Sequence, residues 1–109
     1  MIFHLKIKAQ HLERNINREY EILVYKVLFG LWGVILAFGR QGTKGTSKNY
    51  VFPNIQETQK FVHKTVQKRL RAPKRIGCPY SLVSVKVDNL DHLPQWLPPQ
   101  QHQVLIRSP

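Results

Sequence analysis

Aromatic, glycine and basic residues gather where one apolar stretch ends. Residues 31–38 are mostly apolar and run directly into Gly39 and Arg40, and the loop that follows contains two more glycines and Lys44. An arginine fork and a lysine can hold phosphate, a glycine lets another surface approach the backbone, and an aromatic ring can stack on a sugar or a base. The stretch that ends in Phe38 therefore has the residue types needed to hold a sugar–phosphate chain.

Each part of this stretch also has a purely structural interpretation. A lone phenylalanine at the end of a strand usually belongs to the core, and glycines in a short loop supply the positive φ angles of a hairpin. The segment Gly42–Gly45 is not a nucleotide P-loop, because no glycine precedes a Lys-Ser or Lys-Thr pair and a strand follows instead of a helix. The lysines are a separate matter, since a turn does not need them.

Charge is the strongest global signal in the 109 residues. Lys and Arg number 17 against 6 Asp and Glu, which gives a formal net charge of +11 and a pI near 10.2. A positive electrostatic field attracts polyanions, so the charge indicates the kind of partner and says nothing about the fold. DNA is the expected partner. The same charge would also attract RNA, so charge does not distinguish the two. A soluble protein without a nucleic-acid ligand, or a ribosome-associated protein, would carry the same charge.

The elements that position these residues are a sheet and a helix. Strands are predicted at residues 3–8, 20–28, 31–39, 46–52 and 80–87. A polar loop is predicted over residues 10–18. Both faces of the strand at 31–39 are apolar, so we expect it to be central and covered on both sides. The expected fold class is α+β, a mostly antiparallel β-sheet with one α-helix packed against it.

The helix follows the fourth strand. Asn54 is a good N-cap with Glu57 in the capping-box position, and Pro73 is expected to end the helix. The stripe predicted to face the sheet contains Thr58, Phe61, Val62, Thr65, Val66 and Leu70. A basic stripe on another face begins with Lys60 and Lys64 and continues to Lys68 and Arg71. It is either a second phosphate-facing surface or an ordinary solvated face that suits the helix dipole.

Composition changes after residue 87. We expect residues 1–87 to form the domain and residues 88–109 to form a Pro-rich C-terminal tail or arm, with an edge strand near 104–106. Trp96 and Leu97, flanked by prolines, either pack on the domain or dock a protein partner. A protein-interaction module is therefore the alternative to nucleic-acid binding.

The sequence offers little for catalysis. The acidic residues are scattered, His63 lies between lysine-bearing turns of the predicted helix, and Cys78 has no second cysteine for a disulfide or a zinc site. We therefore expect no enzymatic activity, metal, cofactor or small-molecule substrate. No apolar run approaches the roughly 18 residues of a spanning helix, so we expect no membrane association, and a cytoplasmic protein with nucleoid association as an option.

Residues 28–52, LFGLWGVILAFGRQGTKGTSKNYVF, resemble the WGR domain, which is named for a Trp-Gly-Arg triplet. The order aromatic, Gly, Arg, x, Gly, Thr, Lys, Gly matches residues 38–45, and Trp32 matches an aromatic residue often found six positions upstream. The predicted helix and residues 77–83 also fit, so the resemblance covers roughly residues 1–85. Phe38 replaces the tryptophan of the triplet, and Ala37 stands where family members often carry a basic residue.

WGR domains occur in the poly(ADP-ribose) polymerases that respond to DNA damage and in bacterial proteins. In the polymerases the module binds the end of a DNA break: the tryptophan stacks on a terminal sugar, and basic residues hold the backbone. The resemblance implies that Phe38 takes the stacking position and that Arg40 contacts DNA or a neighbouring domain. The predicted nucleic-acid-binding residues are Phe38, Gly39, Arg40, Lys44, Lys48, Trp32, Lys60 and Lys64.

Overall fold

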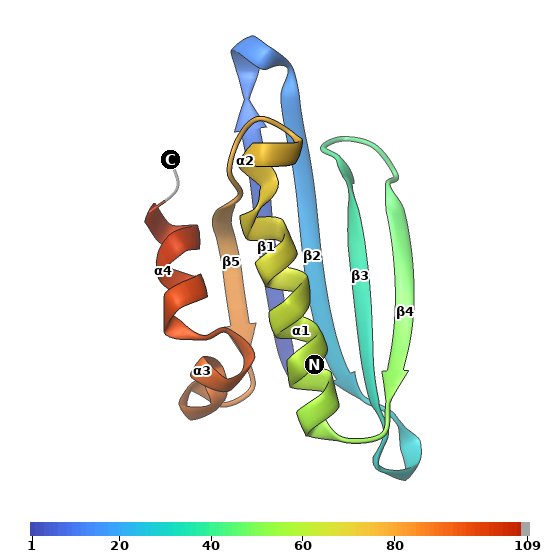
Figure 1. The fold of residues 1–109 in the computed structure, drawn as a ribbon. Coiled ribbons are helices and arrows are strands. Elements are labelled where there is room, and N and C mark those ends of the chain that lie inside the picture. The colour runs from blue at the N-terminus through green and yellow to red at the C-terminus, as the bar shows by residue number, and fades with distance from the viewer. Residues whose placement is uncertain (108–109) are drawn as a thin grey trace.

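The computed structural model describes residues 1–107 and has an α+β fold, as predicted. Its sheet has 5 antiparallel strands in the order β4-β3-β2-β1-β5, with the helices on one face (Figure 1). The strands are β1 (Phe3–His11), β2 (Ile16–Lys26), β3 (Trp32–Arg40), β4 (Thr46–Phe52) and β5 (Ser81–Val87). The helices are α1 (Ile55–Leu70), α2 (Ala72–Arg75), α3 (Leu93–Trp96) and α4 (Pro99–Arg107). Short 3₁₀ turns lie at Leu12–Arg14, Leu28–Gly30 and Leu90–His92.

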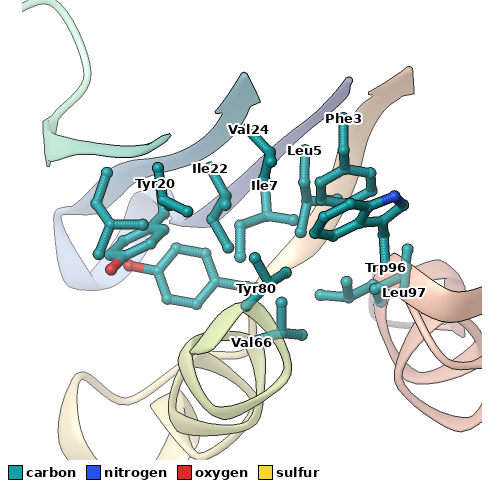
Figure 2. Close-up of a cluster of buried hydrophobic side chains, with 14 of the residues drawn as sticks. Phe3, Leu5, Ile7, Tyr20, Ile22, Val24, Val66, Tyr80, Trp96 and Leu97 are labelled. Atoms are coloured by element: carbon teal, nitrogen blue, oxygen red, sulfur yellow. The ribbon is translucent and has the colours of Figure 1, made fainter. Parts of the chain in front are cut away.

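The core lies between the sheet and the helices (Figure 2). Alternate residues of β1 and β2 point into it, because successive side chains of a strand face opposite sides. Phe3 pairs with Val24 and Leu5 with Ile22, and all four side chains are buried. The ring of Phe3 stacks on Trp96 of α3, with the ring centroids 5.8 Å apart.

Helix α1 begins as predicted. The side-chain oxygen of Asn54 accepts a hydrogen bond from the backbone N–H of Glu57 at 2.8 Å. The predicted stripe faces the sheet, with Thr58, Val62, Thr65 and Val66 buried and the remaining two members partly buried. Helix α1 ends at Leu70, and Pro73 lies in the first turn of the short helix α2. The proline therefore opens a second helix, where its missing N–H costs nothing.

The loop predicted over residues 10–18 is mostly strand. The pairing of β1 with β2 continues to His11 and Ile16, which leaves a short turn in which Asn15 adopts the left-handed conformation with φ 56°. The polar side chains misled the prediction, because at this end of the sheet most side chains are polar and only Ile16 packs against the core. Backbone pairing maintains the strands there, together with side-chain contacts such as the hydrogen bond that Arg14 donates to the backbone oxygen of Gly77 at 2.9 Å.

The expectation that β3 is covered on both sides is wrong. β3 is interior to the sheet, between β2 and β4, but the helices of residues 1–107 cover only one face. On the open face β3 carries Gly33 and Ala37 among its residues, and the side chain of Tyr25 on β2 covers Gly33. The ring of Tyr25 lies against Gly33 so closely that a Cβ there would be 2.3 Å from a ring atom.

The C-terminal segment is helical, so the edge strand expected near residues 104–106 is wrong. These residues belong to α4, whose Leu105 is buried in the same core as Trp96 and Leu97. The side-chain amide of Gln101 donates to the backbone oxygen of His63 at 3.1 Å, which fastens α4 to α1. An apolar triplet is too short to distinguish strand from helix by periodicity. In the described part of the chain, no helix is both long and apolar enough to cross a membrane.

Candidate nucleic-acid interface

Three connecting segments form one end of the molecule, the upper end in Figure 1. They are residues 12–18 (the β1–β2 turn and the start of β2), residues 40–45 (the end of β3 and the β3–β4 loop) and residues 68–74 around the end of α1. Their basic residues are Arg14, Arg18, Arg40, Lys44, Lys68, Arg69, Arg71 and Lys74. Glu13 is the acidic residue of these segments. We call this the basic end, and its charge density is what a polyanion would recognise.

A cleft of about 280 Å³ lies beside the basic end, between α1 and the strands β3 and β4. Its lining contains four aromatic rings and three cationic side chains. The residues that line it are Tyr20, Leu36, Phe38, Lys48, Tyr50, Phe61, Thr65, Lys68 and Arg69. We call it the aromatic–cationic cleft. Aromatic rings combined with Lys and Arg are the residue types that hold single-stranded nucleic acid.

Strand register brings the rings and cations of the cleft together. Tyr20 and Phe38 are cross-strand neighbours on the helix-covered face, and their rings stack with centroids 5.3 Å apart and planes 12° from parallel. Lys48 of β4 projects from the same face, and its Nζ lies 5.9 Å from the centroid of the Phe38 ring. The guanidinium carbon of Arg69 lies 4.7 Å from the centroid of the Tyr20 ring. Cation–π attraction therefore holds both cations against the stack.

One polar group of the cleft lacks a partner. Among the residues that the structure describes, the buried Nε of Arg69 has no hydrogen-bond partner. A buried donor without an acceptor is unfavourable by about 1–3 kcal/mol. Phe61, which lies on the same face of α1 as Arg69, packs against β4, with its ring 4.7 Å from Tyr50 and 5.0 Å from Phe52, centroid to centroid.

Arg40 has a structural partner. Its guanidinium donates to the side-chain oxygen of Asn15 at 2.7 Å and to the backbone oxygen of Asn15 at 3.1 Å. The backbone N–H of Gln41 donates to the backbone oxygen of Asn17 at 2.9 Å. Arg40 therefore ties the β3–β4 loop to the β1–β2 turn and keeps two parts of the basic end together.

The backbone that approaches Gly39 is that of Gly45. A Cβ on Gly39 would lie 2.7 Å from the Cα of Gly45, and a Cβ on Gly45 would lie 2.6 Å from the carbonyl oxygen of Phe38. The two ends of the β3–β4 loop thus touch each other. These two glycines are needed by the loop itself, which agrees with the structural interpretation of the glycines in the sequence.

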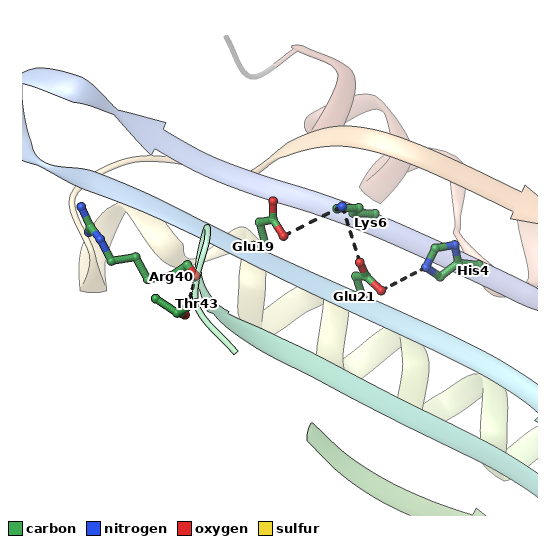
Figure 3. A network of polar contacts seen from close by, with 6 residues as sticks. All are labelled: His4, Lys6, Glu19, Glu21, Arg40 and Thr43. Carbon is green, nitrogen blue, oxygen red and sulfur yellow. Dashed lines mark hydrogen bonds and ion pairs between the residues drawn. The ribbon is translucent and has the colours of Figure 1, made fainter. Parts of the chain in front are cut away.

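A second hollow, of about 420 Å³, lies beside the same loop but suits phosphate less well. Phe38, Gly39, Arg40 and Lys44 line it together with the carboxylates Glu19 and Glu21. Those carboxylates are paired: Lys6 Nζ lies 3.9 Å from Glu19 and 3.6 Å from Glu21, and Glu21 also contacts His4 at 3.3 Å (Figure 3). Negative charge next to a bound phosphate is repulsive, so the aromatic–cationic cleft is the better seat.

The structure separates the remaining predicted residues. Lys44 is exposed in the loop at the basic end, while Lys60 and Lys64 are exposed on the solvent side of α1, outside the cleft. Trp32 lies at the opposite end of β3 from Phe38, with its ring 6.0 Å from that of Trp96. Of the predicted set, Phe38 and Lys48 therefore share the cleft and Trp32 does not.

The sequence prediction missed several residues of the cleft. Tyr20 and Tyr50 fell within predicted strands and Phe61 within the stripe facing the sheet, and only strand register places Tyr20 beside Phe38. A helical signal existed, because Phe61, Thr65 and Arg69 recur every four residues and so lie on one face of α1. The cation Arg69 at the end of that face distinguishes it from a purely apolar stripe that only packs on a core.

The sequence model of the WGR domain family matches residues 3–72 of this chain. The chain belongs to the WGR domain family. The match runs from β1 to the first residue of α2 and includes the strand and loop that carry Phe38, Gly39 and Arg40. Membership in this family of binding modules, which have no catalytic activity by themselves, is consistent with a nucleic-acid-binding role. No curated protein matches the chain.

Proposed function

We propose that this chain is a non-enzymatic DNA-binding module that holds the sugar–phosphate backbone at the basic end and reads geometry instead of base sequence. The observation that supports it most is the aromatic–cationic cleft, where two stacked rings lie under two cations. The net charge of +11 supplies the long-range attraction.

The size of the cleft favours a strand end over continuous duplex. A hollow of about 280 Å³ between a helix and a sheet accepts one planar group at a time. An internal base of a duplex is stacked on both sides, and moving it out costs a few kcal/mol. A terminal nucleotide has lost one stacking neighbour, so it enters at a lower free-energy cost. The basic end would then contact the phosphates that follow.

The test is fluorescence-anisotropy binding to a blunt duplex, a nicked duplex, a closed dumbbell and an RNA hairpin of matched length. Lys48→Gln removes the cation above Phe38, and we expect it to weaken binding to ends about fivefold to tenfold, as one lost charged contact should. Lys86→Gln on β5 is the matched control, because it removes an exposed strand lysine far from the cleft. Lys86→Gln should lower the affinity for every ligand slightly and by the same factor.

Three outcomes would contradict the proposal or part of it. Equal losses in Lys48→Gln and Lys86→Gln would mean that the charge acts generically and that the cleft is only part of the scaffold. Equal affinity for the dumbbell and the blunt duplex would remove the preference for ends. Tighter binding to the RNA hairpin than to any DNA would move the proposal from DNA to RNA.

A further inference from the structure

The turn between β2 and β3 carries a feature that neither the fold nor the basic end requires. Leu28 is 75% exposed and Phe29 is 97% exposed. Phe29 also has φ 63° and ψ 31°, a left-handed conformation, and Gly30 follows with φ 74°. Hairpin turns with two positive φ angles favour Asn-Gly. A bulky residue there costs on the order of 1 kcal/mol or more. We call residues 28–30 the apolar tip.

A hollow of about 360 Å³ opens next to the apolar tip. Lys26 and Trp32, the last residues paired between β2 and β3 before the turn, both line it. Its apolar walls are Ile2, Trp32, Ile55 and Trp96, and its polar lining is Lys26, Asp88, His92 and Gln95. We call it the tryptophan hollow, because it contains both tryptophans of the chain. The hollow is larger than a phenylalanine side chain, and the chain's own Phe29 remains outside it in solvent.

The charge at this end of the molecule suits a second copy of the chain. The apolar tip lies at the opposite end of β2 and β3 from the basic end (Figure 1). The carboxylates of Asp88 and Asp91 are exposed here, near the hollow, and they offset the charges of Lys26 and Lys86, the exposed lysines at this end of β2 and β5. Two chains that each carry +11 repel one another. Contact at this end keeps their basic ends farthest apart, so it is the approach with the least repulsion.

We propose that two copies associate end to end about a two-fold axis, with Phe29 of each chain seated in the tryptophan hollow of the other. Such an interface is self-complementary, because the projecting group and the hollow lie on one end of the same molecule. Lys26 of one chain would then lie near Asp88 or Asp91 of its partner. An interface made of two small contacts falls below about 1,200 Å² and should be weak, in the micromolar range. The dimer would present its two basic ends outward.

The test is sedimentation velocity over a concentration series, with tryptophan emission and acrylamide quenching recorded on the same samples. We expect a monomer–dimer equilibrium in the wild type, with the tryptophans becoming protected over the same concentration range. Phe29→Asn should raise the dimer dissociation constant about tenfold or more, because it removes the inserted ring. Since Asn-Gly suits this turn, the melting temperature should stay equal or rise, so loss of the dimer cannot be ascribed to unfolding.

Leu12→Asn is the matched control, because Leu12 is 79% exposed on the turn at the basic end. It should leave dimerisation unchanged. A wild-type protein that stays monomeric to its highest soluble concentration would overturn the proposal and leave the apolar tip for a different protein or a lipid surface. A dimer that persists in Phe29→Asn, or forms without protecting the tryptophans, would place the interface elsewhere and also overturn it. The samples contain no nucleic acid, so the result is independent of the proposed DNA binding.

Discussion

Gly42 and Gly45 lie in the same loop with φ angles of +84° and +68°, yet their surroundings differ. A Cβ on Gly42 would meet nothing within 4 Å, whereas a Cβ on Gly45 would lie 2.6 Å from the carbonyl oxygen of Phe38. Asparagine tolerates the left-handed conformation at either position, so the backbone angle can be separated from the steric contact. At the scale of single residues, the contact is what makes Gly45 special.

We therefore expect Gly45→Asn to lower the free energy of unfolding by about 1–3 kcal/mol, as overpacking against backbone does. Gly42→Asn should change it by less than about 0.5 kcal/mol. Urea denaturation of both variants measures the difference. Equal stability of the two would show that β3 and β4 can separate at the loop without cost.

Arg40, like Gly45, belongs to the loop that was predicted to bind phosphate, and its contacts in the structure stabilise the fold. Arg40→Lys keeps the positive charge but loses the fork that bonds both oxygens of Asn15. The side chain is exposed, so we expect a loss of about 1 kcal/mol, seen as a fall in melting temperature of roughly 4 °C. DNA affinity measured well below the transition should change less than twofold. A large loss of affinity without a loss of stability would return Arg40 to the phosphate contacts predicted from the sequence.

At the scale of elements, α4 is integral to the core although it follows the segment that the WGR model matches. Leu105 is 0% exposed and packs in the cluster that contains Trp96, while the adjacent Ile106 is 60% exposed. The amide of Gln101 bridges to α1 through the backbone oxygen of His63 and the side-chain oxygen of Gln67. Burial of the apolar side chain, not chain connectivity, is what keeps this helix in place.

Leu105→Ala should accordingly cost about 2–5 kcal/mol of unfolding free energy, the usual range for a leucine removed from a core. Ile106→Ala, one position along the same helix, should cost less than about 0.5 kcal/mol. Thermal and urea unfolding of both variants provide the comparison. Were Leu105→Ala as stable as wild type, α4 would behave as a detachable arm.

At the scale of the whole molecule, charge is polarised along the sheet. The basic end gathers Arg and Lys from three segments that are distant in the sequence, and the opposite end offsets Lys26 with exposed aspartates. A ligand with regularly spaced phosphates would therefore meet several cations at once at the basic end, under the proposed function. The same polarity is what permits two copies to meet at the other end.

If about six phosphates are contacted, the logarithm of the DNA association constant should fall with the logarithm of salt concentration with a slope near −5. The measurement is a salt titration of binding to the blunt duplex. Lys48→Gln should reduce the magnitude of the slope by about one, because one phosphate contact is removed. A slope near zero would eliminate backbone contacts as the source of affinity.

Short-range patterns in the amino-acid sequence determine the secondary-structure elements and the family of this protein. Runs of apolar, β-branched and aromatic residues predicted the strands, Asn54 predicted the start of α1, and the order of residues 38–45 indicated the family. These features depend on neighbours within a few positions, and such patterns are legible without the fold. The composition likewise determines the net positive charge, which does not depend on the fold.

Tertiary structure decided what the local patterns could not. Strand register, which is a long-range pairing, set Tyr20 beside Phe38 and placed Lys48 above the ring. The packing of α1 on the sheet then brought Arg69 to the same rings and left Trp32 at the far end of β3. The residue types in the sequence indicate which kinds of chemistry are available. Only the contacts between distant segments decide which of those residues meet, because a cleft is made of side chains that no sequence window contains.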